Sequence, residues 1–468
     1  MKVFKIYLII VISLLFALTI NSHAQDLNNY LISAAENNPG LKWRFKEYQA
    51  SLLRVPQVGS LPDPEVSFGY FIEPMERYIG KQVAEISIMQ MFPWYGTLGS
   101  ARNEASLMAK AKYEEFNEAK SLLFYEVKAT WYGIYLIRKE IDITEENIKI
   151  LRTLEEVAVT RYTTSATDGN SIPGNREMKV EKKNESTGSS GGMGGMNKQQ
   201  TTGRPQSQMS SGMSEMPSGG SSMIDVIRIQ LEINELNNSL SILNTELHHL
   251  IIQFNNLLNR NLNLKVIVPD TLLPSDLPVP VSQIPDSIKQ NNQMLKMLEQ
   301  EEKAFLAQER MNRQMGFPMI GIGLQYNIFK PRHDSESMMN GKNMLMPMAT
   351  FTIPLWRRKY SSSIRESVML REAVSERNVE TYNELIVTYE EGIKDYEEAA
   401  RRINLYRQQT VLGERILRIL IVQYTTAGSD FEEVLRMQEQ LLNYKLQLLN
   451  AVVDQNVSVA MLERLMGR

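Results

Sequence analysis

The sequence contains no cysteine and only four histidines among its 468 residues. Without cysteine the chain cannot form a disulfide framework, and it cannot carry a lipid on an N-terminal cysteine. The shortage of histidine argues against a zinc or nickel site rich in that residue. A net charge of −3 gives no sign of nucleic-acid binding. Function must therefore be inferred from repeats and periodicity.

Long hydrophobic runs are also missing, except at the N-terminus. There, Lys2 and Lys5 precede an apolar stretch over residues 6–20, which a small-x-small cleavage site at Ala24 follows. The stretch is shorter than the roughly 20 residues of a spanning helix, which favours a cleaved signal peptide over a membrane anchor. No later segment is apolar enough to span as a helix, so a membrane-inserted form of the chain must use β-strands.

Two copies of one structural unit fill the rest of the chain. Residues 37–42 recur as residues 291–296 with both asparagines, the leucine and the lysine in place, and residues 161–164 correspond to residues 423–426. Self-similarity at this scale indicates a duplication. The predicted organisation is a signal peptide (1–24), a first repeat (25–258), an equatorial linker (259–280) and a second repeat (281–468).

Each repeat is predicted to contain a helix, two strands, a long helix, a short loop and a further helix. In the first repeat we expect these elements over residues 27–53, 65–72, 83–92, 98–162 and 224–258. In the second we expect them over residues 285–313, 319–328, 346–353, 361–424 and 431–466. The proline-rich segment 269–280 cannot be helical throughout.

The expected strands alternate in polarity. Ile320, Ile322 and Leu324 fall on one face of their strand, with Gly321 and other small or polar residues on the opposite face. Such strands could face lipid on one side and a lumen on the other, or they could belong to a half-buried sheet.

The long helices favour the first alternative. About 65 residues of helix span close to 100 Å, which exceeds the core of a globular domain. Their apolar stripes step by four and three residues, as at Leu385, Tyr389 and Gly392, which is typical of coiled-coil packing. Residues 224–258 and 285–313 together nearly equal one long helix, so we expect this pair to stack end to end beside it.

Four strands in one chain cannot close a membrane barrel, because single-chain barrels have at least about eight strands. Three copies supply about 12 strands and about 12 helical columns. The predicted fold is therefore mainly α with a small transmembrane β part, assembled as a trimeric 12-stranded β-barrel that is continued by a long α-helical barrel.

These features resemble the TolC-like outer-membrane factor family over essentially the whole chain after the signal peptide. The resemblance rests on the duplicated unit, on the strand-to-helix corner over residues 90–98, and on the segments around Tyr162 and Tyr424. The corner looks more like the heavy-metal (copper and silver) efflux branch than the drug-efflux branch. The chain departs from many members of that branch in lacking a cysteine for lipidation, and its second corner lacks the glycine of the first.

The resemblance implies an outer-membrane duct of a tripartite efflux system in a Gram-negative bacterium, with its helical barrel in the periplasm. Its partners would be two further copies of itself, outer-membrane lipid, a periplasmic adaptor (membrane fusion) protein and an inner-membrane RND pump. Such a duct is not an enzyme and has no resident cofactor, and Cu(I) or Ag(I) would pass as transient cargo. The alternatives are the same duct for drugs, organic toxins or type I protein secretion, and a periplasmic coiled-coil adaptor without a barrel.

The loop ends of the long helices are expected to form the periplasmic tip at which the adaptor docks. The predicted docking residues are Arg161, Tyr162, Thr163, Thr164, Asp225, Gln423, Tyr424, Thr425, Thr426, Gly428, Asp430 and Glu433. Acids also gather at this tip, and repeated around a trimer they could form a ring that favours cations. They are Asp168, Asp225, Asp430, Glu432 and Glu433. Asp225 and Asp430 also suit helix capping, because acids near a helix N-terminus are stabilising.

The first repeat carries an insertion of about 54 residues, within residues 167–222, that the second repeat lacks. Its composition is mostly Gly, Ser, Asn, Gln, Lys and Met, which predicts disorder. Thioether sulfur suits Cu(I) and Ag(I), so the insertion is a candidate metal tether, and a tolerated low-complexity loop is the alternative. The candidate ligands are Met193, Met196, Met209, Met213 and Met216.

A second group of methionines belongs to the strand region. Its members are Met89, Met91, Met338, Met339, Met344, Met346 and Met348. We expect Met89 and Met91 on the lumenal face of their strand. The group suits either a lumenal path for soft metal ions or flexible filling of irregular packing.

Overall fold

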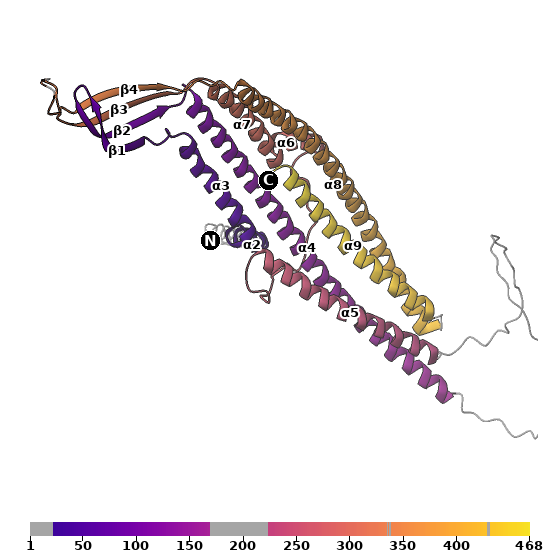
Figure 1. Ribbon diagram of the computed structural model, residues 1–468. Coiled ribbons are helices and arrows are strands. Elements are labelled where there is room, and N and C mark those ends of the chain that lie inside the picture. Colours follow the sequence, from indigo (N-terminus) through magenta and orange to yellow (C-terminus); the bar gives the residue numbers. More distant parts are fainter. Residues whose placement is uncertain (1–21, 169–222, 335, 337, 428–430) are drawn as a thin grey trace, which may run out of the picture. The chain divides into compact units, whose positions relative to one another are not determined.

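The computed structural model describes residues 22–168, 223–334, 336, 338–427 and 431–468 (Figure 1). The elements of the first repeat are α2 (Ser22–Asn37), α3 (Pro39–Val58), β1 (Glu65–Arg77), β2 (Gly80–Phe92), α4 (Thr97–Asp168) and α5 (Met223–Leu257). Those of the second are a 3₁₀ turn η1 (Val281–Gln283), α6 (Ile284–Asn291), α7 (Gln293–Met315), β3 (Ile320–Lys330), β4 (Met344–Phe351), α8 (Arg357–Ala427) and α9 (Phe431–Leu465). A mainly α chain with a duplicated helix–strand–strand–helix unit is confirmed.

Asparagine breaks the first helix of each repeat, so the single helices predicted over residues 27–53 and 285–313 were wrong. Asn38 and Asn292 are extended, and their side-chain oxygens accept hydrogen bonds from Leu41 N (3.1 Å) and Met294 N (2.9 Å). Each asparagine is the N-cap of a new helix, because its side chain satisfies an amide that has no partner in the first turn.

The same asparagines join helix ends that are far apart in sequence. The side-chain amide of Asn38 donates to the carbonyl of Leu257 at the end of α5 (2.8 Å), and that of Asn292 donates to the carbonyl of Leu465 at the end of α9 (3.1 Å). The start of α3 therefore meets the end of α5, and the start of α7 meets the end of α9. The predicted stacking of α5 on the next helix of the sequence was wrong.

The helices α5 and α9 end in the same way. Asn259 and Gly467 follow α5 and α9 with positive φ angles of 49° and 72°. Their amides, and those of the next residues, bond back to carbonyls of the last helical turn, which is the usual way of satisfying those carbonyls. The duplication seen in the sequence thus extends to the caps.

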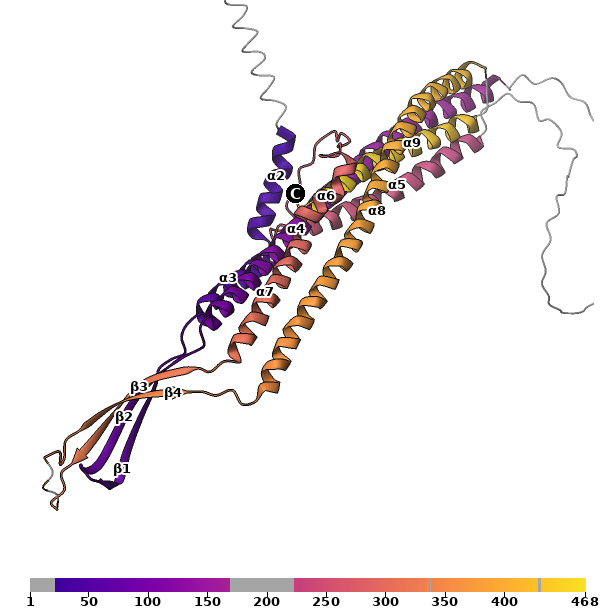
Figure 2. The same ribbon diagram turned by 90° about the horizontal axis from the view of Figure 1, so that it is seen from above.

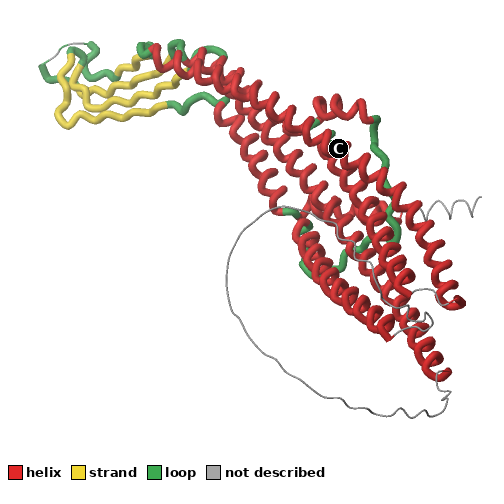
Figure 3. The backbone as a smooth tube through the Cα atoms, turned by 90° about the vertical axis from the view of Figure 1, so that its right-hand side faces the viewer, coloured by secondary structure: helices red, strands yellow, loops and turns green. Residues whose placement is uncertain are grey.

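The linker between the repeats is not helical, as its prolines predicted (green in Figure 3). It is held by hydrogen bonds from the side chains and backbone around it. Trp131 Nε1 donates to Ile267 O (3.0 Å), and the amides of Ile267 and Leu272 donate to the hydroxyls of Tyr30 and Tyr135 (both 3.0 Å).

The chain separates into two compact units, each built from both repeats. Unit 1 comprises residues up to Ile141, Ile242–Arg407 and Lys445–Arg468, and unit 2 comprises Asp142–Ser241 and Gln408–Tyr444. The coiled-coil stripes are confirmed inside each unit: Leu385 and Tyr389 are buried in unit 1, as Ile148 and Leu151 are in unit 2. The boundaries of the two repeats remain a prediction.

Within unit 1, a short helix lies beside the first part of each long helix (Figures 1 and 2). Phe45 of α3 contacts Phe116 of α4, with ring centroids 5.3 Å apart. Arg371 of α8 pairs with Glu309 of α7 at 2.7 Å. The strands leave from the ends of these helix pairs.

The four strands form one antiparallel sheet of order β1-β2-β3-β4. The strand bounds differ from those predicted, most of all for β1, which continues to Arg77. Its apolar alternation stops at Ile72, but Glu76 and Arg77 still pair with Lys81 and Gly80 beyond an irregular register. Backbone pairing needs no apolar side chain, so periodicity could not locate this end. Among the described helices, none is both long enough and apolar enough to cross a membrane.

Candidate functional sites in the sheet and at the helix ends

One face of the sheet consists of apolar side chains that point to solvent. The register aligns Phe68, Ile86, Tyr326 and Leu345 across all four strands, and the next row is Val66, Ile88, Leu324 and Pro347. Phe68 is 67% exposed and Ile322, farther along β3, is 60% exposed. No described helix covers this face (Figures 1 and 3). A continuous exposed patch of this kind marks a surface that meets protein or lipid.

The opposite face is polar. Gln82 Nε2 donates to Asn327 Oδ1 (2.9 Å) and Gln325 Nε2 donates to Glu85 Oε2 (2.9 Å). A hydrogen bond of 2.6 Å joins the hydroxyls of Ser67 and Ser87, in the row of Gln325. Gln82 and Asn327 are buried, so these polar side chains serve one another as hydrogen-bond partners. The alternation predicted from the sequence is therefore present in three dimensions.

The sheet has two free edges in the part of the chain that the structure describes. β1 pairs only with β2 and β4 only with β3, so the outer backbone groups of both strands have no strand partner there. An exposed sheet edge is a template for pairing with another strand.

The strand methionines gather on the polar face. Met89 and Met91 pair with Gly323 and Gly321 across β2 and β3. On β4, Met348 pairs with Gly323, while Met346 and Met344 pair with Gln325 and Asn327. The members that share this face are Met89, Met91, Met344, Met346 and Met348. Met338 is 91% exposed and, with Met339, lies in the β3–β4 loop instead. The structure therefore assembles five of the seven residues predicted as a group.

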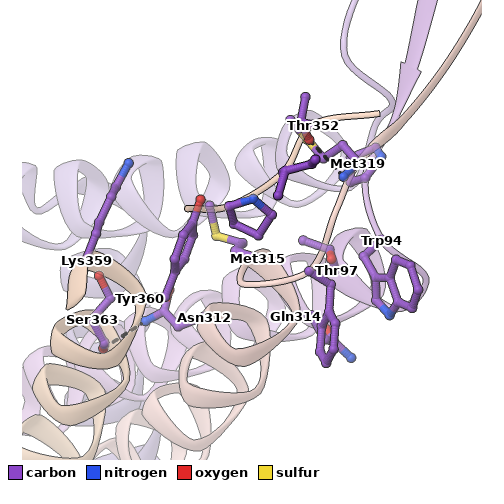
Figure 4. Close-up of a pocket in the computed structure, with 14 residues that line it drawn as sticks. Trp94, Thr97, Asn312, Gln314, Met315, Met319, Thr352, Lys359, Tyr360 and Ser363 are labelled. Atoms are coloured by element: carbon purple, nitrogen blue, oxygen red, sulfur yellow. Dashed lines mark hydrogen bonds between the residues drawn. The ribbon is translucent and has the colours of Figure 1, made fainter. Parts of the chain in front are cut away.

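The two strand-to-helix corners pack around a cavity of about 320 Å³ (Figure 4). Trp94, from the corner that carries the family resemblance, stacks on Phe317 with ring centroids 5.1 Å apart. Asn312 of α7 donates to the hydroxyl of Ser367 (2.7 Å) and to the carbonyl of Ser363 (3.1 Å) on α8. The corner motif thus fixes where the sheet joins the helices.

Within unit 2, Tyr424 is a buried core residue. This side chain is 2% exposed, and its ring packs against Phe431 with centroids 5.1 Å apart. Its counterpart in the first repeat, Tyr162, is 43% exposed. Tyr424 is therefore a packing residue in this structure, and docking has to rest on the exposed members of the predicted set.

The structure describes the side chains of most, but not all, of the remaining predicted docking residues. Tyr162, Thr163, Gln423, Thr425, Thr426 and Glu433 are exposed, and Asp225 is half-buried. The hydroxyls of Thr163, Thr425 and Thr426 donate to carbonyls of the preceding turn. Asp225 lies in the first turn of α5, where its charge favours the helix dipole. The side chains of Arg161 and Thr164 lie outside the described set, as do Gly428 and Asp430.

Two further predictions concern residues that the structure does not describe. They are the signal peptide, over residues 1–21 of its range, and the methionine insertion, over residues 169–222 with its five candidate ligands. Across the described residues, no cluster of three or more His, Cys, Asp or Glu side chains could hold a metal ion.

Sequence reasoning missed the contacts between α5 and α9 in unit 2. Arg228 pairs with Glu432 at 2.8 Å. Nearby, burial and then repulsion from Glu439 and Glu235 raise the pKa of Glu232 above the ordinary value of 4.5. No local sequence pattern pairs α5 with α9. Only their equivalent positions, each directly after the loop of its repeat, could have suggested this contact.

No protein-family model matches the chain, and no curated protein matches it. Solved structures do. A structure of CusC, described in terms of folding and transmembrane channel formation, matches with a TM-score of 0.70 at 12% identity, covering 94% of this chain and 92% of that one. The outer membrane protein VceC of Vibrio cholerae gives 0.68 at 13% identity (95% and 96%), and the CmeC outer membrane channel of Campylobacter jejuni gives 0.67 at 9% identity (94% and 85%). The chain has the fold of these channel proteins over nearly its whole length.

Proposed function

We propose that this chain is one protomer of a homotrimeric outer-membrane duct in a tripartite efflux system. The observation that carries the proposal is the sheet, which has a bare apolar face, a polar face and two free edges. Three such sheets, joined edge to edge, make a 12-stranded barrel whose apolar face meets lipid. The fold shared with outer-membrane channels supports the same assembly.

The duct conducts passively and performs no chemical step. Its cargo arrives from an inner-membrane RND pump through a periplasmic adaptor, which docks on the helix ends of unit 2. The exposed residues Tyr162, Thr163, Gln423, Thr425 and Glu433 are the proposed contacts there. The mature chain is proposed to begin near Gln25, and the absence of cysteine leaves it without an N-terminal lipid.

The proposed cargo is a soft metal ion, Cu(I) or Ag(I). The support is chemical: the chain combines a methionine-rich insertion with methionines on the polar face of the sheet, and thioethers prefer these ions. An organic toxin or a secreted protein is the competing cargo. Deletion of the gene separates them, since metal cargo predicts lost copper and silver tolerance with unchanged dye and detergent tolerance. Titrating a peptide of residues 193–216 with Cu(I) tests the insertion, where binding no tighter than micromolar removes its role.

Fractionation tests the duct itself. We expect the protein in the outer-membrane fraction, migrating on gels as a trimer that heating dissociates. A protein found wholly soluble in the periplasm contradicts the proposal and favours the coiled-coil adaptor.

A further inference from the structure

Two methionine sulfur atoms converge above a glycine on the polar face of the sheet. The Sδ atoms of Met91 and Met89 lie 2.6 and 3.2 Å from the point where a Cβ atom of Gly321 would stand. The two sulfurs are therefore no farther apart than the sum of these distances. Any side chain at Gly321 would displace them, so glycine provides the space that they occupy.

A third methionine stands on the same face of the sheet, in the row next to that of Gly321. Met348 of β4 pairs with Gly323, and Gly323 pairs with Met89 on its other side. Directly paired residues of an antiparallel sheet share a face, so Met348 and Met89 stand on either side of the glycine. The hydroxyl of Thr350 lies 3.7 Å from Met89 Sδ and completes the surroundings.

Packing alone does not account for this cluster. Methionine fills irregular gaps in cores, but Met89 and Met91 are only half-buried, and no described helix covers this face of the sheet (Figures 1 and 3). Leucine or valine would fill a strand position of this kind equally well. The feature that methionine adds is a neutral, soft sulfur donor.

We propose that Met89, Met91 and Met348 form a binding site for a soft monovalent cation, Cu(I) or Ag(I), on the lumenal face of the barrel. The inference rests on the proposed duct and assigns it a specific ion site. Thioethers favour Cu(I) over hard cations such as Mg²⁺ or Ca²⁺. Three copies in the trimer form a ring of weak sites, which suits an ion that must bind and leave.

The test uses the full-length trimer in planar bilayers, with silver nitrate as the probe in chloride-free buffer. The variant Met89→Leu/Met91→Leu keeps side-chain size and removes both sulfurs. Met338→Leu/Met339→Leu, in the exposed loop, is the matched control. We expect Ag(I) to reduce potassium conductance in the wild-type and control channels, with a half-blocking concentration at least tenfold higher in the Met89/Met91 variant.

Crystals soaked in silver nitrate supply a readout that does not need a conducting pore. We expect an anomalous silver peak within bonding distance of the sulfurs of Met89 and Met91, and none there in the leucine variant. Equal block of all three channels, or silver peaks only elsewhere, overturns the site. Those outcomes leave the duct intact, whereas failure of the duct itself appears as absence of potassium conductance without silver.

Discussion

At the scale of single residues, two asparagines organise unit 1. Asn38 and Asn292 each cap one helix with the side-chain oxygen and hold the last turn of another with the side-chain nitrogen. Asparagine suits this position because one short side chain carries both an acceptor and donors. The sequence showed both residues as marks of the duplication, but it gave no sign of what their nitrogens bind.

Separate substitutions at Asn292 distinguish the two roles. Asn292→Asp retains the cap oxygen and loses the donor to Leu465, whereas Asn292→Ala loses both. We expect the alanine variant to lose about 1–2 kcal/mol of stability through the cap alone, and more through the unpaired carbonyl. Thermal unfolding of the detergent-solubilised protein measures both, with Asn291→Ala, an exposed neighbour, as control. Equal stability of the Asn292→Ala and Asn291→Ala variants would falsify the capping role.

The raised pKa of Glu232 predicts a dependence of stability on pH. Burial and the neighbouring Glu439 and Glu235 disfavour the ionised form in the folded chain. Stability from this group is therefore fully present below the unfolded pKa and is lost as pH rises through the raised folded pKa. Glu232→Gln should raise the unfolding temperature at pH 7.5, and this gain should vanish near pH 4. Glu146→Gln, at an exposed site on α4, is the control, and a gain that persists at low pH contradicts the assignment.

At the scale of elements, the hairpin ends decide where the strands stop. Gly80 begins β2 with a φ of 136°, and a Cβ atom there would lie 2.7 Å from the carbonyl oxygen of Lys330. The amide of Gly341 donates to the carbonyl of Ile79 at 2.7 Å, which fastens the two strand loops together. These contacts extend the sheet beyond the segment that alternates.

A pair of glycine substitutions tests this end of the sheet. Gly80→Ala should destabilise the protein by about 1–3 kcal/mol, because alanine is strained at this φ and its Cβ atom would meet the carbonyl oxygen of Lys330. Gly99→Ala, in the first turn of α4, adds a Cβ that meets nothing within 4 Å. It should stabilise the helix by about 0.5–1 kcal/mol. Unfolding temperatures that shift in the same direction for both variants would contradict the argument.

At the scale of the whole molecule, the proposed barrel depends on the two faces of one sheet. Ile322 and Gln325 belong to the same strand but to opposite faces. The bare apolar face is costly in water and favourable against lipid. Because both edges of the sheet are free, the proposed barrel closes only with sheets from further copies of the chain.

Lysine substitutions on the two faces test this arrangement. Ile322→Lys places a charge on the lipid face, at a cost of about 2–4 kcal/mol near the bilayer midplane. Gln325→Lys places it on the polar face within reach of Glu85, which Gln325 contacts at 2.9 Å. We expect the first variant to lose heat-dissociable trimer from outer-membrane fractions and the second to retain it. Equal trimer yield from both variants argues that the apolar face does not meet lipid.

Much of this protein was readable from its sequence. The duplication follows from recurring residues. The long helices, their buried stripes and the two-faced strands follow from periodicity, which depends only on the chemical nature of residues along the chain. The corner around Trp94 was also recognisable in the sequence, but the stacking of Trp94 on Phe317 was not predicted.

Tertiary structure alone decided which helix ends meet, which tyrosine is buried and which glycine lies beneath the two methionine sulfurs. Asn38 reaches the end of α5, Tyr424 packs on Phe431, and Met89 and Met91 meet above Gly321, in each case through partners distant in sequence or on another strand or helix. Local patterns carry no information on such pairs, because they are set by the geometry of chain return. The sequence by itself determined the periodic elements of this protein, and long-range packing determined the contacts that give those elements their roles.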